Sequence, residues 1–356
     1  MIRPVLVPRE QPLPGGTWLV VSLCLAASLL AVGLILHLSG VNPWQALCET
    51  CFGAFGDLYG LSETLVKATP LLLCGLGVSL AFATGLWNIG AEGQLYAGAL
   101  AAAWVALSFP TWPSWLLLGS MTLAGMAGGA LWALGPAWLK ARWQVNEIIT
   151  TLMLNYIAIS LLDYLVYGPW RDPVSHGFPM SPMFPPAAVL PTLGNTRVHL
   201  GLAFGLVACV VVWMILGRTR LGFVMRVTGA NRTAAQASGM PITRTIILAM
   251  LLSGALAGLA GMGEVSAIQH RLRPGISPGY GYTAIIVAWL ARLKPQVILL
   301  VSVLFGALLV GGETLQMTMK VPPHMVYMAQ GVILFFVLAG EFVAQFRVRW
   351  LKEDQR

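Results

Sequence analysis

Residues 83–98 read ATGLWNIGAEGQLYAG and place three polar side chains, Asn88, Glu92 and Gln94, between two apolar segments. Gly85, Gly90 and Gly93 in the same stretch loosen the backbone. A carboxylate is costly to place in lipid, so Glu92 is expected to face protein groups or a watery path. Two interpretations stay open: a broken helix that lines a translocation path, and a structural cluster of polar side chains that holds two helix ends together.

The composition of the whole chain is that of a membrane protein. Of the 356 residues, 57% are hydrophobic and only 10% are charged, and the mean hydropathy is +0.78. A soluble domain carries about 25% charged residues, so this chain has too few charges to cover a water-exposed surface. These values exclude ordinary soluble enzymes, disordered proteins and the usual nucleic-acid binders. They predict an all-α, polytopic bundle of membrane helices.

The apolar pattern predicts about ten transmembrane segments, because a helix needs about 20 residues to cross a bilayer. The expected segments are 18–38, 65–85, 89–109, 114–138, 146–167, 199–216, 245–267, 280–291, 296–315 and 325–345. Segment 280–291 is too short to span alone, and it is expected either to be a half-helix or to begin earlier. Segment 89–109 is weakened by Glu92 and Gln94, and such segments usually pack against protein or a cavity.

Charge placement predicts the orientation of these segments. With the N-terminus inside, 15 of the 21 Lys and Arg residues fall on the inside, in agreement with the positive-inside rule. The expected organisation is a cytoplasmic segment 1–16, a transmembrane domain 17–345 and a cytoplasmic tail 346–356. The Pro-rich loop 168–198 is expected outside, and the loop 217–244 is expected inside.

A second polar pattern lies in the segment NEIITTLMLNYIA, residues 146–158. Glu147, Thr151 and Asn155 recur every four residues and therefore share one face of a helix. A polar stripe on an apolar helix faces other helices or a channel. Interhelical hydrogen bonding that holds the bundle together is the alternative to a role in transport.

The inside loop contains VTGANRTAAQASGMPITR, residues 227–244. A short helix is expected over residues 233–237, with Asn231 as its N-cap and Gly239 as its stop. Such a helix of small residues can sit in a groove of another protein. A solvated loop is the alternative.

The sequence contains no P-loop and no zinc-protease motif. A P-loop needs a Gly-Lys-Ser/Thr turn, and none of the five Lys residues follows a glycine. The pattern H-E-x-x-H is also missing. Cys48 and Cys51 form a C-x-x-C, but no thioredoxin-like βαβ pattern surrounds it. We therefore expect no enzyme activity, no metal and no cofactor in this chain.

Five motifs occur in a fixed order: WNIGAEGQ, NEIITTLMLNY, TGANRTAAQASGM, SGALAGLAG and GYGYTAIIVAWLAR. With them the chain resembles, from about residue 60 to 345, the permease subunits of bacterial ABC importers. The similar branch is the nucleoside and simple-sugar branch of the branched-chain amino acid/ribose-type permease family. The resemblance implies about ten helices in two inverted-related halves, used as a pair in the inner membrane.

The resemblance also implies partners and roles. Two ATP-hydrolysing subunits would dock on the inside loop, and a periplasmic or lipid-anchored binding protein would deliver the substrate. The family's coupling segment corresponds here to Gly229, Asn231, Ala234, Ala235 and Gly239. Its broken-helix motif corresponds to Asn88, Gly90, Glu92, Gly93 and Gln94.

The translocation path is expected to offer polar and aromatic groups, because neutral hydrophilic solutes need no fixed counter-charge. The candidate residues of the path are Trp87, Asn88, Glu92, Gln94, Thr151 and Asn155. The alternative function is an ion-coupled secondary transporter of small polar solutes. It would use intramembrane carboxylates as proton or sodium sites, with Glu92, Asp163 and Glu313 as candidates.

Overall fold

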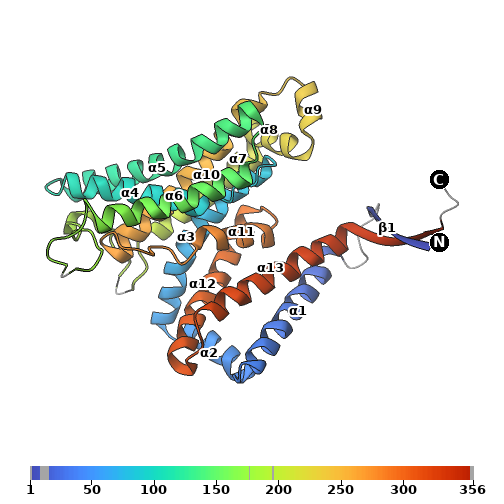
Figure 1. The fold of residues 1–356 in the computed structure, drawn as a ribbon, viewed down its shortest axis with the longest axis horizontal. Helices are drawn as coiled ribbons and strands as arrows, with labels where there is room; N and C mark the ends of the chain where they lie inside the picture. Colours follow the sequence, from blue (N-terminus) through green and yellow to red (C-terminus); the bar gives the residue numbers. More distant parts are fainter. Residues whose placement is uncertain (1, 9–15, 176, 195, 353–356) are drawn as a thin grey trace. The chain divides into compact units, whose positions relative to one another are not determined.

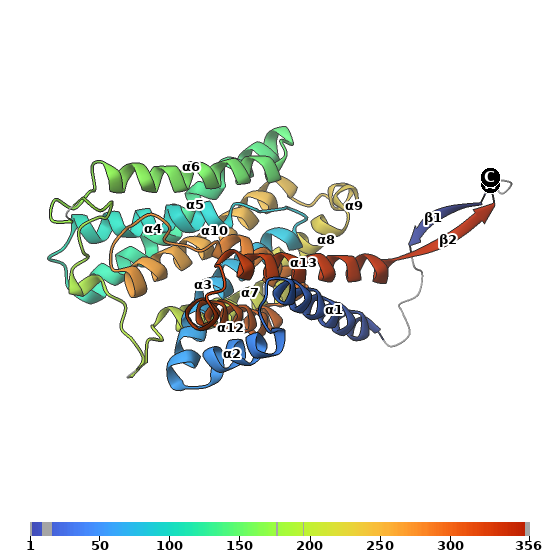
Figure 2. The same ribbon diagram turned by 60° about the horizontal axis from the view of Figure 1, so that its bottom comes forward.

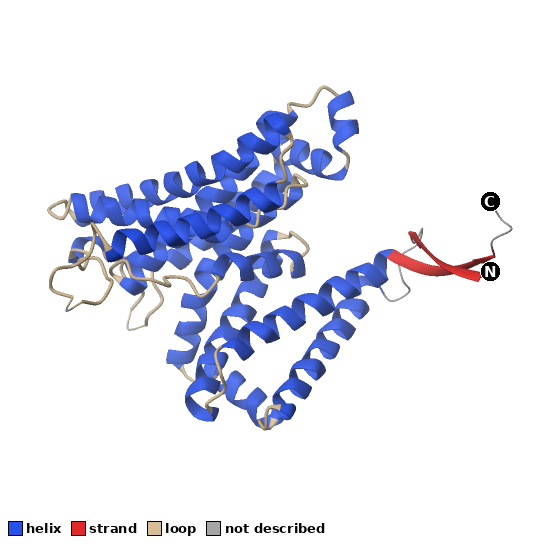
Figure 3. Cartoon of the chain, in the orientation of Figure 1, coloured by secondary structure: helices blue, strands red, loops and turns tan. Residues whose placement is uncertain are grey.

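The computed structural model describes residues 2–8, 16–175, 177–194 and 196–352. The chain divides into two compact units. One unit holds Ala54–Val310, and the other holds Met1–Gly53 together with Gly311–Arg356. Most of the described chain is helical (Figure 3).

The unit that holds both chain ends pairs its first long helix with its last one. α1 (Gly16–Leu38) packs against α13 (His324–Gln345). α2 (Pro43–Phe55) follows α1 at a bend of 113°. α12 (Pro295–Met319) begins in the other unit and ends in this one.

Two short strands next to these helices were not predicted. β1 (Ile2–Pro8) pairs antiparallel with β2 (Phe346–Lys352), with Ile2 opposite Lys352. The sequence analysis took both ends as tails of a purely α-helical protein. In FRVRWLK, however, apolar and basic residues alternate, which is the two-residue period of a strand.

The other unit is a bundle of helices (Figure 1). Its helices are α3 (Leu58–Ala83), α4 (Ala91–Ser108), α5 (Ser114–Trp143), α6 (Glu147–Tyr167), α7 (Gly201–Arg218), α8 (Arg220–Ala230), α9 (Arg232–Ala237), α10 (Ile242–Glu264) and α11 (Tyr280–Leu290). A 3₁₀ turn, Pro186–Ala188, and one turn of π-helix, Val265–Gln269, complete it.

Each of the ten predicted apolar segments coincides with a helix. The segment 280–291 is the short α11, as expected. α2 and α8 were missed, because neither stands out as an apolar run of spanning length. Within the described ranges, six helices are long and apolar enough to cross a membrane, or seven if the bent pair α1 and α2 counts as one span.

The core of the bundle is formed by α10 lying against α4 and α5. Three glycines of α10, at positions 254, 258 and 261, face backbone atoms of these neighbours. A Cβ on Gly258 would collide with the carbonyl oxygen of Gly125, and a Cβ on Gly98 would collide with the Cα of Gly258. The glycine spacing therefore serves close helix packing.

The two long loops of the bundle lie at opposite ends of its helices. α8 and α9 lie at the end of α5 and α10 where α6 begins, and the segment 168–198 lies at the other end (Figures 1 and 2). The loop between α7 and α10 is therefore not an irregular loop but two short helices.

Candidate functional site

The site is built around the irregular segment between α3 and α4, residues 84–90. α3 ends at Ala83, and Gly85 then takes a φ of +76°, which favours glycine. The side chain of Asn88 turns back and accepts a hydrogen bond from the backbone N–H of Gly90 at 2.9 Å. α4 begins directly afterwards at Ala91. The break in the helix is thus stabilised by residues of the break itself.

Asn88 also joins this segment to two helices. Its amide forms a reciprocal pair with the amide of Gln94, with N···O distances of 3.0 and 3.1 Å. It donates a further hydrogen bond to the hydroxyl of Ser253 on α10 at 2.8 Å. All three side chains are buried. Because a buried amide needs partners, this network fixes the position of the break.

Asn155 fixes the other side of the break from α6. Its Oδ1 accepts from the N–H of Gly93 at 2.8 Å, and its Nδ2 donates to the carbonyl of Ile89 at 2.9 Å. The same Nδ2 lies 3.2 Å from the hydroxyl of Tyr282. Thr151, one turn earlier, is buried and donates to the carbonyl of Glu147 on its own helix. The predicted polar stripe is therefore the buried face of α6.

Glu92 stabilises the start of the half-helix α11. Its side chain is buried, and its Oε2 accepts from the N–H of Gly281 at 2.7 Å. The hydroxyl of Ser277 also hydrogen-bonds the carboxylate, and its oxygen accepts from the N–H groups of Gly279 and Tyr280. The first amides of a helix carry partial positive charge, which favours an anion at this position.

Trp87 differs from the other candidate path residues, since 44% of its surface is exposed. Its backbone N–H lies 3.4 Å from Oε1 of Glu147. The other carboxylate oxygen of Glu147 forms an ion pair with Lys140 at 2.7 Å. The five polar members of the predicted set are thus buried behind an exposed tryptophan.

The predicted short helix on the inside loop is present as α9. The side chain of Asn231 accepts from the N–H of Ala234 at 3.0 Å and caps the helix, as predicted. Gly239 follows the helix with a φ of +69°, which is the glycine stop that was expected. Ala234 is exposed and Ala235 is buried.

The end of α8 touches the broken segment directly. A Cβ on Gly229 would collide with the carbonyl oxygen of Ala83 and would lie 3.0 Å from the nitrogen of Gly85. The two groups of residues singled out in the sequence, the break near Asn88 and the inside loop, therefore meet at a contact between backbones.

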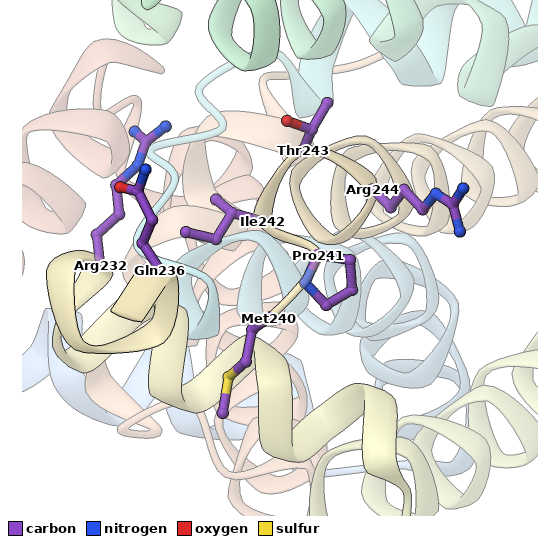
Figure 4. Close-up of a pocket in the computed structure, with 7 residues that line it drawn as sticks. All are labelled: Arg232, Gln236, Met240, Pro241, Ile242, Thr243 and Arg244. Atoms are coloured by element: carbon purple, nitrogen blue, oxygen red, sulfur yellow. The ribbon is translucent and has the colours of Figure 1, made fainter. Parts of the chain in front are cut away.

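A hollow of about 420 Å³ lies beside α9. Figure 4 shows Arg232 and Gln236 side by side on α9, with Ile242 pointing toward them from the start of α10. The other lining residues are Met240, Pro241, Thr243 and Arg244. Arg232 also donates to Oε1 of Gln144 at 2.6 Å, which ties α9 to the end of α5. The hollow thus combines apolar side chains with cationic ones.

The structure also identifies members of the site that were not predicted, namely Ser253, Ser277, Gly281 and Tyr282. Ser253 lies within the glycine-rich motif, and the other three lie in or just before GYGYTAIIVAWLAR, so both regions had been noted without a role for these residues. Among the residues that the structure describes, no group of three or more His, Cys, Asp and Glu side chains is placed to hold a metal ion.

A membrane bundle with a broken helix at its core, joined to a short capped helix at one end, has the architecture of a transport subunit. The chain belongs to the family described as "Branched-chain amino acid transport system / permease component", whose model matches residues 60–338. It is therefore a multi-pass permease subunit of an ABC transporter and not itself an enzyme. This membership decides against the ion-coupled alternative.

Three relatives illustrate the family. Glucose ABC transporter permease protein TsgB13 of Haloferax volcanii is 39% identical, over 92% of this chain and 88% of its own. Guanosine ABC transporter permease protein NupP of Bacillus subtilis is 34% identical, over 94% of this chain and 97% of its own. Guanosine ABC transporter permease protein NupQ, also of Bacillus subtilis, is 26% identical over 78% of this chain and 90% of its own.

Proposed function

We propose that this chain forms the translocation path of an ABC importer for nucleosides or simple sugars. The printed functions of the relatives, glucose and guanosine transport, support this substrate class. The electrostatics of the site are consistent with a neutral solute. The carboxylate of Glu92 is hydrogen-bonded by the N–H of Gly281 and the hydroxyl of Ser277, and that of Glu147 is paired with Lys140. Neither is left over as a counter-charge for an ionic substrate.

The path runs along the broken segment. Trp87 supplies its exposed wall, while Asn88, Glu92, Gln94, Thr151 and Asn155 form the frame behind that wall. Burial of these five side chains supports the division, because each is hydrogen-bonded to neighbouring protein groups. A frame of this kind keeps the irregular backbone satisfied at membrane depth, where water is scarce.

The observation that carries the mechanism is the contact between Gly85 and Gly229. The coupling segment, with Gly229, Asn231, Ala234, Ala235 and Gly239, receives the motion of the ATP-binding subunits at α9 and its hollow. α8 transmits that motion to the broken segment, because no side chain separates the two backbones. Closure of the partner subunits would then change the access to Trp87 from one side of the membrane to the other.

The topology follows from the ends of the bundle. Loop 168–198 lies outside and loop 217–244 lies in the cytoplasm, and both termini are cytoplasmic, as the charge bias favours. About ten segments cross or enter the membrane, with α4 and α11 as the weakened or half-spanning ones. The two halves are inverted repeats, in which α3 and α4 correspond to α10 and α11. The meeting of the starts of α4 and α11 at Glu92 supports this relation.

Three kinds of partner complete the transporter in the bacterial plasma membrane. ATP-binding subunits supply the energy, a second permease completes the path, and a periplasmic or lipid-anchored binding protein delivers the solute. Bacillus subtilis has two guanosine permease proteins that both resemble this chain. This favours a related chain as the second permease over a second copy.

The test is uptake by the reconstituted complex of permeases, ATP-binding subunits and binding protein in vesicles. Guanosine or glucose should accumulate only with ATP present, and an uncoupler of ion gradients should have no effect. Accumulation by the permease alone on a proton or sodium gradient would refute the proposal. Omission of the ATP-binding subunits is the matched control.

A further inference from the structure

Three aromatic rings gather where the broken segment meets α11. Phe82 comes from the last turn of α3, Trp87 from the broken segment and Trp289 from the last turn of α11. The ring centroids of Trp87 and Trp289 are 5.5 Å apart, and those of Phe82 lie 5.2 and 5.8 Å from them. Each ring therefore contacts the other two, although they come from three separate elements.

The cluster presents one ring to its surroundings. Trp87 is 44% exposed, whereas Phe82 and Trp289 are partly buried. An exposed aromatic face backed by other rings is a rigid apolar surface, which loses little conformational entropy when a ligand stacks on it. Glu147, which lies beside the backbone N–H of Trp87, is paired with Lys140.

The cluster also contains a polar group with an unused hydrogen bond. The indole N–H of Trp289 is buried and has no acceptor among the described residues. A buried donor without a partner has lost its hydrogen bonds to water and carries a desolvation cost. A ligand that offers a hydroxyl or carbonyl oxygen beside an apolar ring face would recover part of that cost.

We propose that Trp87 and Trp289 form a stacking site for the ring of the transported solute, either the base of a nucleoside or the face of a pyranose. The ring of the solute stacks on the indole of Trp87. When Trp87 moves, the indole N–H of Trp289 becomes accessible and donates a hydrogen bond to an oxygen of the solute. The inference rests on the proposed function and adds the contact that recognises the solute. Trp87 follows Gly85 by two residues, so the contact between Gly85 and Gly229 controls access to the cluster.

The test uses the complete transporter in vesicles, with guanosine and glucose as probes. Loss of stacking on an aromatic side chain should raise the KM of uptake by Trp87→Leu about tenfold. Trp87→Phe should restore most of the affinity. Trp289→Phe keeps a ring but loses the N–H and should raise KM about fivefold. Trp115→Leu, an exposed tryptophan at the start of α5, is the matched control.

An unchanged KM in Trp87→Leu, or an equal change in Trp115→Leu, would overturn the proposal. A second measurement does not depend on uptake. This measurement is the tryptophan fluorescence of the parent protein and of Trp87→Phe. Lipids with brominated acyl chains should quench the two proteins equally, whereas guanosine should quench the parent more than Trp87→Phe. Strong quenching of Trp87 by the lipid would place the ring against the bilayer and reject the site. In each case ATP-dependent uptake by the parent would still stand, which separates this failure from a failure of the proposed function.

Discussion

The carboxylate of Glu92 accepts a hydrogen bond from the N–H of Gly281 at 2.7 Å, across 189 residues of sequence. Glu92 lies in the first turn of α4, and Gly281 lies in the first turn of α11. The first turns of the two helices are therefore joined through one buried carboxyl group. This relationship explains how a carboxylate is tolerated in the core of a membrane bundle.

Replacing Glu92 should lower transport without removing the protein from the membrane. Glu92→Ala leaves the N–H of Gly281 without its acceptor, at a cost of about 1–3 kcal/mol. We expect at least a tenfold loss of ATP-dependent uptake at an unchanged amount of protein in the membrane fraction. Glu92→Gln keeps an oxygen acceptor and should retain more activity. Normal uptake by Glu92→Ala would remove Glu92 from the frame of the path.

Adding a methyl group at Gly229 should separate ATP hydrolysis from transport. The new Cβ would collide with the carbonyl of Ala83, and overpacking of this kind costs about 1–3 kcal/mol. Gly229→Ala should therefore keep ATPase activity in the complex but lose most of the uptake. Gly217→Ala is the control, because the described structure leaves open space around Gly217. Equal uptake by the two variants would argue against transmission through α8.

A substitution of Gly239 tests the backbone conformation at this position rather than the space around it. Its φ is +69°, and the described atoms leave room for a side chain. A bulky residue such as Trp is strained there by roughly 1–2 kcal/mol, and it would distort the end of α9. Gly239→Trp should uncouple ATPase activity from uptake, while Gly239→Asn should be milder because Asn tolerates this conformation. Full coupling in Gly239→Trp would mean that the partner subunits do not depend on this turn.

The glycine contacts of α10 should dominate the stability of the bundle. Gly258→Ala places a methyl group against the backbone of α5 and should lower the thermal midpoint of the purified protein by several degrees. Gly263→Ala, on the same helix, has free space around it in the described structure and should have little effect. A similar midpoint for both variants would show that α10 can move away from α5 at little cost.

His199 should make the start of α7 sensitive to acid. Burial lowers the pKa of its imidazole to about 4, and Nδ1 accepts from the N–H of Gly201. The unfolded chain binds a proton near pH 6.5, so it gains protons before the folded chain does. Stability is therefore full above pH 6.5 and is lost as the pH falls toward 4, by roughly 3 kcal/mol. Thermal midpoints measured from pH 7 to pH 4 should show this decline in the parent, and His199→Gln should show less of it.

Much of this fold could be predicted because its signals are local. The apolar runs predicted the long helices, and Asn231 and Gly239 predicted where α9 begins and ends. The four-residue spacing of Glu147, Thr151 and Asn155 identified the buried face of α6. Each of these features depends on neighbours within one or two turns of a helix.

The remaining features depend on contacts between distant segments. Asn88 meets Ser253 across 165 residues, and Asn155 meets Tyr282 across 127 residues. No local period encodes which helix lies beside which, so these partners could not be assigned from the sequence. The strand pair of the chain ends was missed although β2 carries a two-residue alternation, because its partner β1 lies far along the chain.

The glycine stripe of α10 has a consequence for how the protein can change shape. At Gly98, Gly258 and Gly125 the backbones of the helices contact each other directly, with no layer of side chains between them that could change rotamer and let the helices slide. α4, α5 and α10 must then travel as one rigid block during the transport cycle. The flexing is left to the pieces that are not helical, above all the seven residues between α3 and α4.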